Sequence, residues 1–265
     1  MLNYISSELY KTFHRRYTKL FLLITALLCI GGNALLRVIF SMAGILNFGF
    51  PLYFGIMLMP MCFALLTIVV DAVFSDEYKH GTLKNAVSFG ISRGKIYFGK
   101  LAVEIVLMLV TIAVVLVFYS ASALLFTQIG SHEPIAWQEM SLFLEKTALS
   151  LPLWLGMLGV LNLLVFAFRS NTLYGFSAMI VFSFPGPVLG ILSEMRPAVH
   201  ALYQVTISRQ FEQLTGGAGF MLGGPGPAAQ PVQPEIIPWC LLVGIGWFAV
   251  SSILGYLLFR RREVK

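Results

Sequence analysis

The sequence predicts an all-α integral membrane protein with six transmembrane helices. Of the 265 residues, 58% are hydrophobic and only 11% are charged, whereas a soluble domain has about 25% charged residues. The mean hydropathy is +0.83, so the chain has too little polar surface to face water. A helix needs about twenty apolar residues to cross the roughly 30 Å hydrocarbon core of a bilayer. The segments that qualify are residues 20–40, 51–73, 101–126, 148–168, 172–192 and 236–259.

The basic residues predict the orientation of these spans. Lys and Arg are enriched on the cytoplasmic side of membrane proteins, and most of the 18 basic residues fall before the first span or after an even-numbered span. The exceptions are Arg37, Lys146, Arg196 and Arg209. We therefore expect a multi-pass protein of the cell (plasma) membrane with both termini in the cytoplasm. The whole chain, residues 1–265, is expected to form a single transmembrane domain without a nucleotide-binding domain.

The first 19 residues are typical of an amphipathic helix that lies in the cytoplasmic interface. Its apolar residues recur at three- and four-residue steps, at Leu2, Ile5, Leu9, Phe13 and Tyr17. Its other face carries Glu8, Lys11, Arg15 and Lys19. A disordered basic leader is the alternative. The long basic region and the lack of an A-x-A-like cleavage site indicate that the first span is retained rather than removed as a signal peptide.

The fifth span is the least regular of the six. Pro185, Gly186 and Pro187 interrupt it, and a helix cannot continue undisturbed through two prolines. Residues 172–184 alone would span only ~20 Å. We expect either a kinked helix or a re-entrant segment that dips back from the outer face, near a transport route. The following residues 195–214 are expected to form short surface helices before a loop rich in glycine and proline.

The sequence predicts no catalytic, metal or nucleic-acid site. Residues 90–94 match GxSxG, but the nucleophile elbow needs a strand before it and a helix after it. Ser92 is instead expected to cap the third span, with Gly90 ending the helix before it. Gly94-Lys95 lacks the spacing and the hydroxyl of a P-loop. No basic patch is interleaved with aromatic residues, so the net charge of +6 does not indicate nucleic-acid binding.

Polar residues inside the predicted spans are few. Asp71 and Glu104 are the only acids there, and both lie about one turn from the cytoplasmic boundary. We expect them to reach the interface or to pair with Lys79 or Lys100, because two interfacial acids do not make a proton path across a membrane. The three cysteines lie in apolar runs without a CxxC motif, so they are expected to be packing residues.

The polar stretch of residues 75–100, between the second and third spans, is the candidate functional site. Residues 75–80 are expected to extend the second span into the cytoplasm. Gly81 then ends that helix and Thr82 caps a two-turn helix over residues 82–89. A short, exposed, capped helix between two membrane helices would form a rigid knob that fits a groove on a partner.

The order of residues in this stretch follows a known pattern: an acid, then Gly-Thr with an apolar residue, then a Ser-Arg tail that ends on a lysine. The residues that match it are Glu77, Tyr78, Lys79, His80, Gly81, Thr82, Leu83, Lys84, Asn85, Ser88, Gly90, Ile91, Ser92, Arg93, Lys95, Ile96, Tyr97 and Lys100. The stretch resembles the first cytoplasmic loop of ABC type-2 exporter permeases, especially the small permeases of bacitracin- and lantibiotic-resistance systems. The six spans, the N-terminal helix and the broken outer region extend the resemblance over the chain.

This resemblance implies a membrane-spanning permease subunit of an ATP-driven exporter, with no enzymatic activity and no cofactor of its own. A separate ABC ATPase subunit, expected in two copies, would hold ATP and Mg and dock on the cytoplasmic loop. The coupling residues that the resemblance implies are Glu77, Tyr78, His80, Gly81, Thr82, Leu83, Lys84, Val87, Ser88, Ser92 and Arg93.

The resemblance also implies a second permease, identical or paralogous, that pairs with this chain within the membrane lipid. The expected substrate is hydrophobic or amphipathic, such as an antimicrobial peptide, a drug or a lipid-like molecule. A secondary transporter or channel is the alternative, and it would need coupling acids or a polar filter at mid-depth. A membrane-embedded enzyme is a third class, which the lack of a clustered nucleophile and base disfavours.

Overall fold

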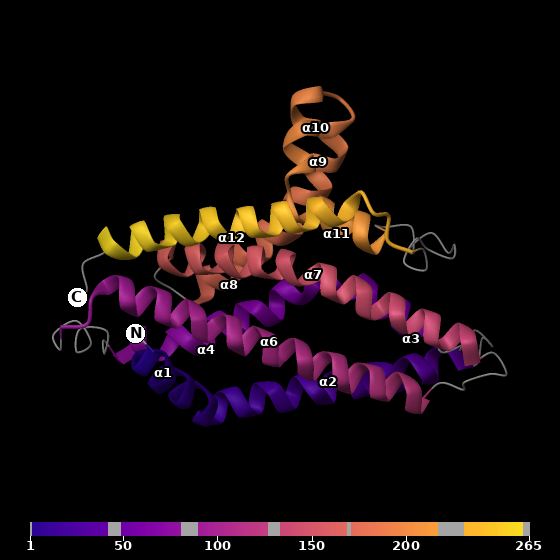
Figure 1. Ribbon diagram of the computed structural model, residues 1–265, viewed down its shortest axis with the longest axis horizontal. Helices are drawn as coiled ribbons and strands as arrows, with labels where there is room; N and C mark the ends of the chain where they lie inside the picture. Colours follow the sequence, from indigo (N-terminus) through magenta and orange to yellow (C-terminus); the bar gives the residue numbers. More distant parts are fainter. Residues whose placement is uncertain are drawn as a thin grey trace.

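A computed structural model of the chain describes residues 2–41, 49–80, 90–126, 133–168, 171–216 and 231–261. All regular structure among these residues is helical, and the helices form an elongated bundle (Figure 1). Six segments are long and apolar enough to cross a membrane, which confirms the predicted fold class. They are Arg16–Phe40, Gly49–Phe74, Arg93–Phe126, Trp137–Ala167, Thr172–Ser193 and Ile236–Arg260.

The N-terminal helix is shorter than predicted. Helix α1 (Leu2–His14) ends at a bend, and α2 (Arg16–Ser41), the first span, begins two residues later. The bend occurs at Arg15, whose Nη1 donates a hydrogen bond to the Ala72 carbonyl at 2.8 Å. The alternative of a disordered leader is therefore wrong.

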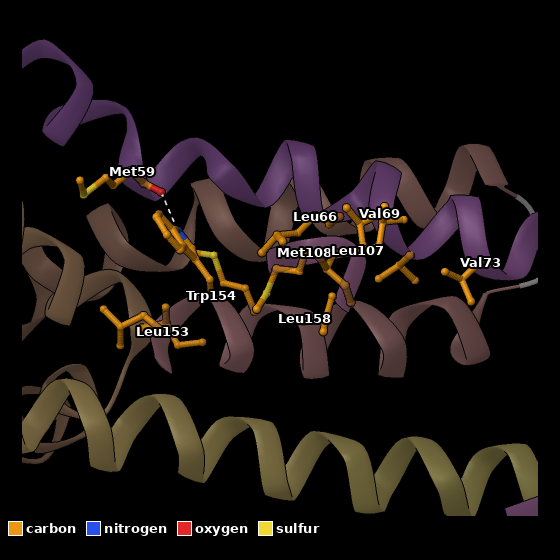
Figure 2. Packing of buried hydrophobic residues seen from close by; sticks show 14 of the residues in the cluster. Met59, Leu66, Val69, Val73, Leu107, Met108, Leu153, Trp154 and Leu158 are labelled. Atoms are coloured by element: carbon orange, nitrogen blue, oxygen red, sulfur yellow. Dashed lines mark hydrogen bonds between the residues drawn. The ribbon is translucent and has the colours of Figure 1, made fainter. Parts of the chain in front are cut away.

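The second span is not one continuous helix, which the sequence analysis did not predict. It consists of α3 (Gly49–Leu58), the 3-10 helix η1 (Met59–Cys62) and α4 (Phe63–His80). The break occurs at Pro60, which has no N–H to donate within the helix. The Met59 carbonyl accepts a hydrogen bond of 3.1 Å from the Trp154 indole, as Figure 2 shows.

The core of the bundle lies where α4 meets α6 (Arg93–Phe126) and α7 (Glu133–Ala167). Side chains from these three helices interdigitate there, among them Leu66, Val69, Leu107, Met108 and Leu158 (Figure 2). Helix α12 (Ile236–Arg261) packs along α7, while α2 packs along α6. Both α4 and α6, which flank the candidate site, thus contribute side chains to this core.

The interruption predicted in the fifth span is confirmed. Helix α8 (Asn171–Ser183) ends before Phe184, and α9 (Pro185–Ser193) begins at the first proline. Phe184 itself keeps a helical backbone (φ −94°, ψ −41°), and the interruption occurs at Pro185 because a proline has no N–H to donate back into α8. Pro185 and Pro187 both lie in the first turn of α9, where their missing N–H groups have no helical partner to lose.

The chain after the break forms the short helices that were expected. Helix α10 (Pro197–Gln204) packs beside α9, and together they form a hairpin that stands away from the long axis of the bundle (Figure 1). Helix α11 (Ile207–Thr215) returns to the bundle and buries Ile207, Phe211 and Leu214. Most of the glycine- and proline-rich loop, residues 217–230, lies outside the described residues.

Candidate functional site at the junction of α1, α4, α6 and α12

The predicted coupling stretch connects α4 to α6. Helix α4 continues to His80, which confirms that residues 75–80 extend the second span. Residues Gly81, Thr82, Leu83, Lys84, Val87 and Ser88 lie outside the described residues, as do the side chains of Glu77, Tyr78 and His80. The site is therefore described by the elements that hold its two ends. We call them the junction: α1, residues 71–80 of α4, residues 90–104 before and within α6, and residues 252–261 of α12.

A tight turn leads from the loop into α6. Gly90 has a φ of +78°, a backbone conformation that costs residues with a side chain more than it costs glycine. The Ser92 hydroxyl accepts a hydrogen bond from the Lys95 backbone N–H at 3.4 Å. Ser92 therefore caps α6 as predicted, and its hydroxyl serves the helix terminus rather than a nucleophile elbow.

We expect Gly90→Val to destabilise the protein by about 1–3 kcal/mol, the usual cost of a branched residue with positive φ. Within the described part of the chain, no atom lies within 4 Å of where the added Cβ would be, so the expected cost comes from the backbone conformation. Gly90→Asn is the matched control, since asparagine tolerates the left-handed region better than other residues. The measurement is the thermal unfolding midpoint in detergent. Equal midpoints for the two variants would contradict the proposed strain.

Two side chains fasten the start of α6 to the end of α12. Arg93 Nη1 donates a hydrogen bond of 2.6 Å to the Arg260 carbonyl. This carbonyl lies in the last turn of α12, where carbonyl groups receive no hydrogen bond from the helix backbone. One turn further, the buried Tyr97 hydroxyl donates to the Ser252 carbonyl at 3.0 Å. The Tyr97 ring also packs against Phe166 and Phe259. The C-terminal flank of the loop is thus fixed to the last span.

A buried ion pair fastens α1 to both α4 and α6. Lys100 on α6 is fully buried, and its Nζ donates to Glu8 Oε2 on α1 at 3.2 Å and to the Val73 carbonyl on α4 at 3.1 Å. The ammonium also lies 5.1 Å from the centre of the Phe74 ring, a distance that suits a cation–π contact. A buried lysine needs such partners, because an uncompensated charge in the interior is costly.

This ion pair corrects two expectations from the sequence. Glu8 was placed on the polar face of α1, and Lys100 was considered as a partner for Asp71 or Glu104. Glu8 is instead 8% exposed, Lys100 is 0% exposed, and the two residues pair with each other. Helix α1 reaches this position because it lies directly on α6, where a Cβ on Gly99 would come within 2.6 Å of the Tyr4 ring. The one sequence signal for the pair is that Glu8 is the single acid of α1.

The two acids predicted near the boundary have different surroundings. Glu104 does not reach the interface. It is fully buried, and its carboxylate accepts a hydrogen bond from the Asn162 amide on α7. The expected attraction by Lys100 is present, because the ammonium interacts electrostatically with this carboxylate. Asp71 is partly exposed. The hydrogen bond of Glu104 joins α6 to α7, so this acid is suited to holding helices together.

Residues 4–186 match the family described as "ABC-2 family transporter protein". The match extends from α1 into the first turn of α9 and contains every part of the junction except α12. No curated protein matches the chain.

Proposed function

Because the chain belongs to the ABC-2 family of transporter proteins, we propose that it is the permease subunit of an exporter whose ATP is hydrolysed by a separate ABC ATPase. The observation that carries this proposal is the anchoring of both ends of residues 81–89. Lys100 ties the flanks to α1, and Arg93 with Tyr97 ties them to α12. A partner that moves the loop would therefore move four helices together.

The proposed mechanism begins with the ATPase docking on the helix expected at residues 82–89. The face that it contacts would carry Leu83 and Val87, with Gly81 and Thr82 setting the turn. Closure of two ATPase subunits would then push on α4 and α6 at the same time. Because the buried ion pair and hydrogen bonds of the junction resist separation, the push would tilt the spans as rigid bodies. In this proposal the junction and both termini are cytoplasmic.

The pathway would form between two permeases, identical or paralogous, and carry a hydrophobic or amphipathic molecule. The hairpin of α9 and α10 exposes apolar side chains: Val188, Ile191 and Leu202 are 50%, 66% and 55% exposed. This exposure supports a role for the hairpin at the interface between the two permeases or in contact with membrane lipid. Pro185, Gly186 and Pro187 set the angle of this hairpin and would act in the outer part of the pathway as a re-entrant segment. An antimicrobial peptide, a drug or a lipid-like molecule is the substrate class we propose.

The test uses the tagged chain expressed together with its neighbouring genes. We expect an ABC ATPase to co-purify with the native chain, and Gly81→Pro combined with Leu83→Asp to abolish this association while membrane insertion continues. The matched control is Pro185→Ala combined with Pro187→Ala, which should alter transport and leave ATPase association unchanged. If the native chain retains no ATPase, the proposal is wrong and a secondary transporter or channel becomes the better explanation.

A further inference from the structure

An apolar cavity of about 310 Å³ lies between α2, the broken second span, α6 and α7. It is separate from the junction. Its wall is rich in sulfur and small residues, with Cys29 and Gly32 from α2, Met59 and Cys62 from η1, Met108 from α6 and Trp154 from α7. The cavity is about twice the size of an engineered 150 Å³ apolar cavity that holds benzene.

The hydroxyl and indole donors of this wall already have hydrogen-bond partners within the bundle. The hydroxyls of Thr25, Thr111 and Thr147 each donate to the carbonyl four residues earlier, at 2.9, 2.8 and 2.7 Å. The Trp154 N–H is bound to the Met59 carbonyl. An internal water needs two to four polar partners, and these donors are already bonded to protein carbonyls, so they are not available to a water. The cavity therefore favours hydrocarbon over water or a polar ligand.

The mouth of the cavity opens on the lipid-facing side of the first two spans. Leu28 of α2 and Met61 of η1 line the cavity and are 66% and 64% exposed. Both belong to segments that are apolar enough to cross a membrane. The medium at the mouth is therefore the acyl region of the bilayer, which supplies a flexible hydrocarbon chain at high concentration.

We propose that this cavity is a binding site for one acyl chain of a membrane phospholipid. An empty apolar cavity leaves the atoms of its wall without packing partners on one side, and a chain that enters from the bilayer supplies them. The adaptable methionine side chains of η1 suit an occupant without fixed shape. The bound chain packs against η1, the joint between α3 and α4, so the site adjoins the span that leads to residues 81–89.

The side chain of Trp154 provides a direct test. It lines the cavity and is only 3% exposed, so bulk lipid does not surround it. In a variant with Trp137, Trp239 and Trp247 replaced by Phe, Trp154 is the single tryptophan left of the 4 in the chain. This full-length variant is reconstituted in nanodiscs of phosphatidylcholine brominated at mid-chain, where bromine quenches tryptophan fluorescence on close approach.

We expect strong quenching of Trp154 that falls by roughly half or more with Gly32→Leu, because the added side chain fills space that the acyl chain occupies. Gly31→Leu is the matched control: among the described residues, neither glycine has an atom within 4 Å of an added Cβ, and of the two only Gly32 lines the cavity. A series of Ala, Val and Leu at position 32 should reduce quenching in order of side-chain volume. Absence of quenching, or an equal effect of Gly31→Leu and Gly32→Leu, would overturn the proposal.

Discussion

Gly244→Val is expected to prevent stable assembly of the bundle. A Cβ at this position would lie 2.3 Å from both the carbonyl carbon and the oxygen of Pro152, and 2.8 Å from the Leu153 nitrogen. These are backbone atoms of α7 and cannot rotate away, so α12 and α7 would have to separate along their contact. Small residues permit such close approach of helices in membranes. We expect a loss of about 3 kcal/mol or more, at the upper end of overpacking costs.

The measurement for Gly244→Val is the yield of monodisperse protein after detergent extraction, followed by its thermal unfolding midpoint. Gly246→Val is the matched control, because it lies two residues away on the same helix and no atom of the described residues is within 4 Å of its added Cβ. A normal midpoint for the control shows that valine itself is tolerated in α12. Near-native behaviour of both variants would contradict the close contact of α7 with α12.

Lys100→Met should destabilise the protein by about 3–5 kcal/mol, because it leaves the Glu8 carboxylate buried without its main partner. The unbranched methionine keeps most of the apolar stem of lysine, so the change tests charge rather than volume. Lys11→Met is the matched control. Lys11 Nζ lies 3.6 Å from Oε1 of the same Glu8 carboxylate, but the Lys11 side chain is 42% exposed. Exposed ion pairs contribute at most about 1 kcal/mol.

A double-mutant cycle separates the ion pair from other effects of Lys100→Met. Glu8→Gln combined with Lys100→Met removes both charges, so we expect the double variant to recover most of the stability lost by the single lysine variant. Thermal unfolding midpoints in detergent, measured at one pH and salt concentration, provide the comparison. If the two lysine variants lower the midpoint equally, or if the double variant is no better than Lys100→Met, the buried pair is not what holds α1 in place.

The sequence predicted the six spans because a long apolar run is a local property that needs no knowledge of the fold. It also predicted the break before Pro185 and the cap at Ser92, since prolines and capping hydroxyls act within one helical turn. The break at Pro60 went unpredicted although its cause is equally local. That proline lies in the middle of an apolar run, and hydropathy alone treats the run as continuous.

The contacts that make the junction could not be predicted, because each joins residues far apart in the chain. Glu8 and Lys100 are separated by 92 positions, and Arg93 and the Arg260 carbonyl by 167. Glu104 and Asn162 are likewise on different helices. The helical pattern of α1 identified Glu8 as polar and therefore as solvated. Only the packing of α1 onto α6 shows that this carboxylate meets a lysine away from water.

The long separation between the partners of the junction also bears on biosynthesis. Chains emerge from the ribosome N-terminus first, so Glu8 is made long before Lys100, and both precede Ser252 and the Arg260 carbonyl. Until the third span arrives, α1 has no buried partner for its carboxylate and must keep it hydrated at the membrane surface. The connections to α12 form only when the last span has been inserted. A chain that stalls before its last span would therefore lack the contacts that join α6 to α12, although α1, α4 and α6 could already be connected.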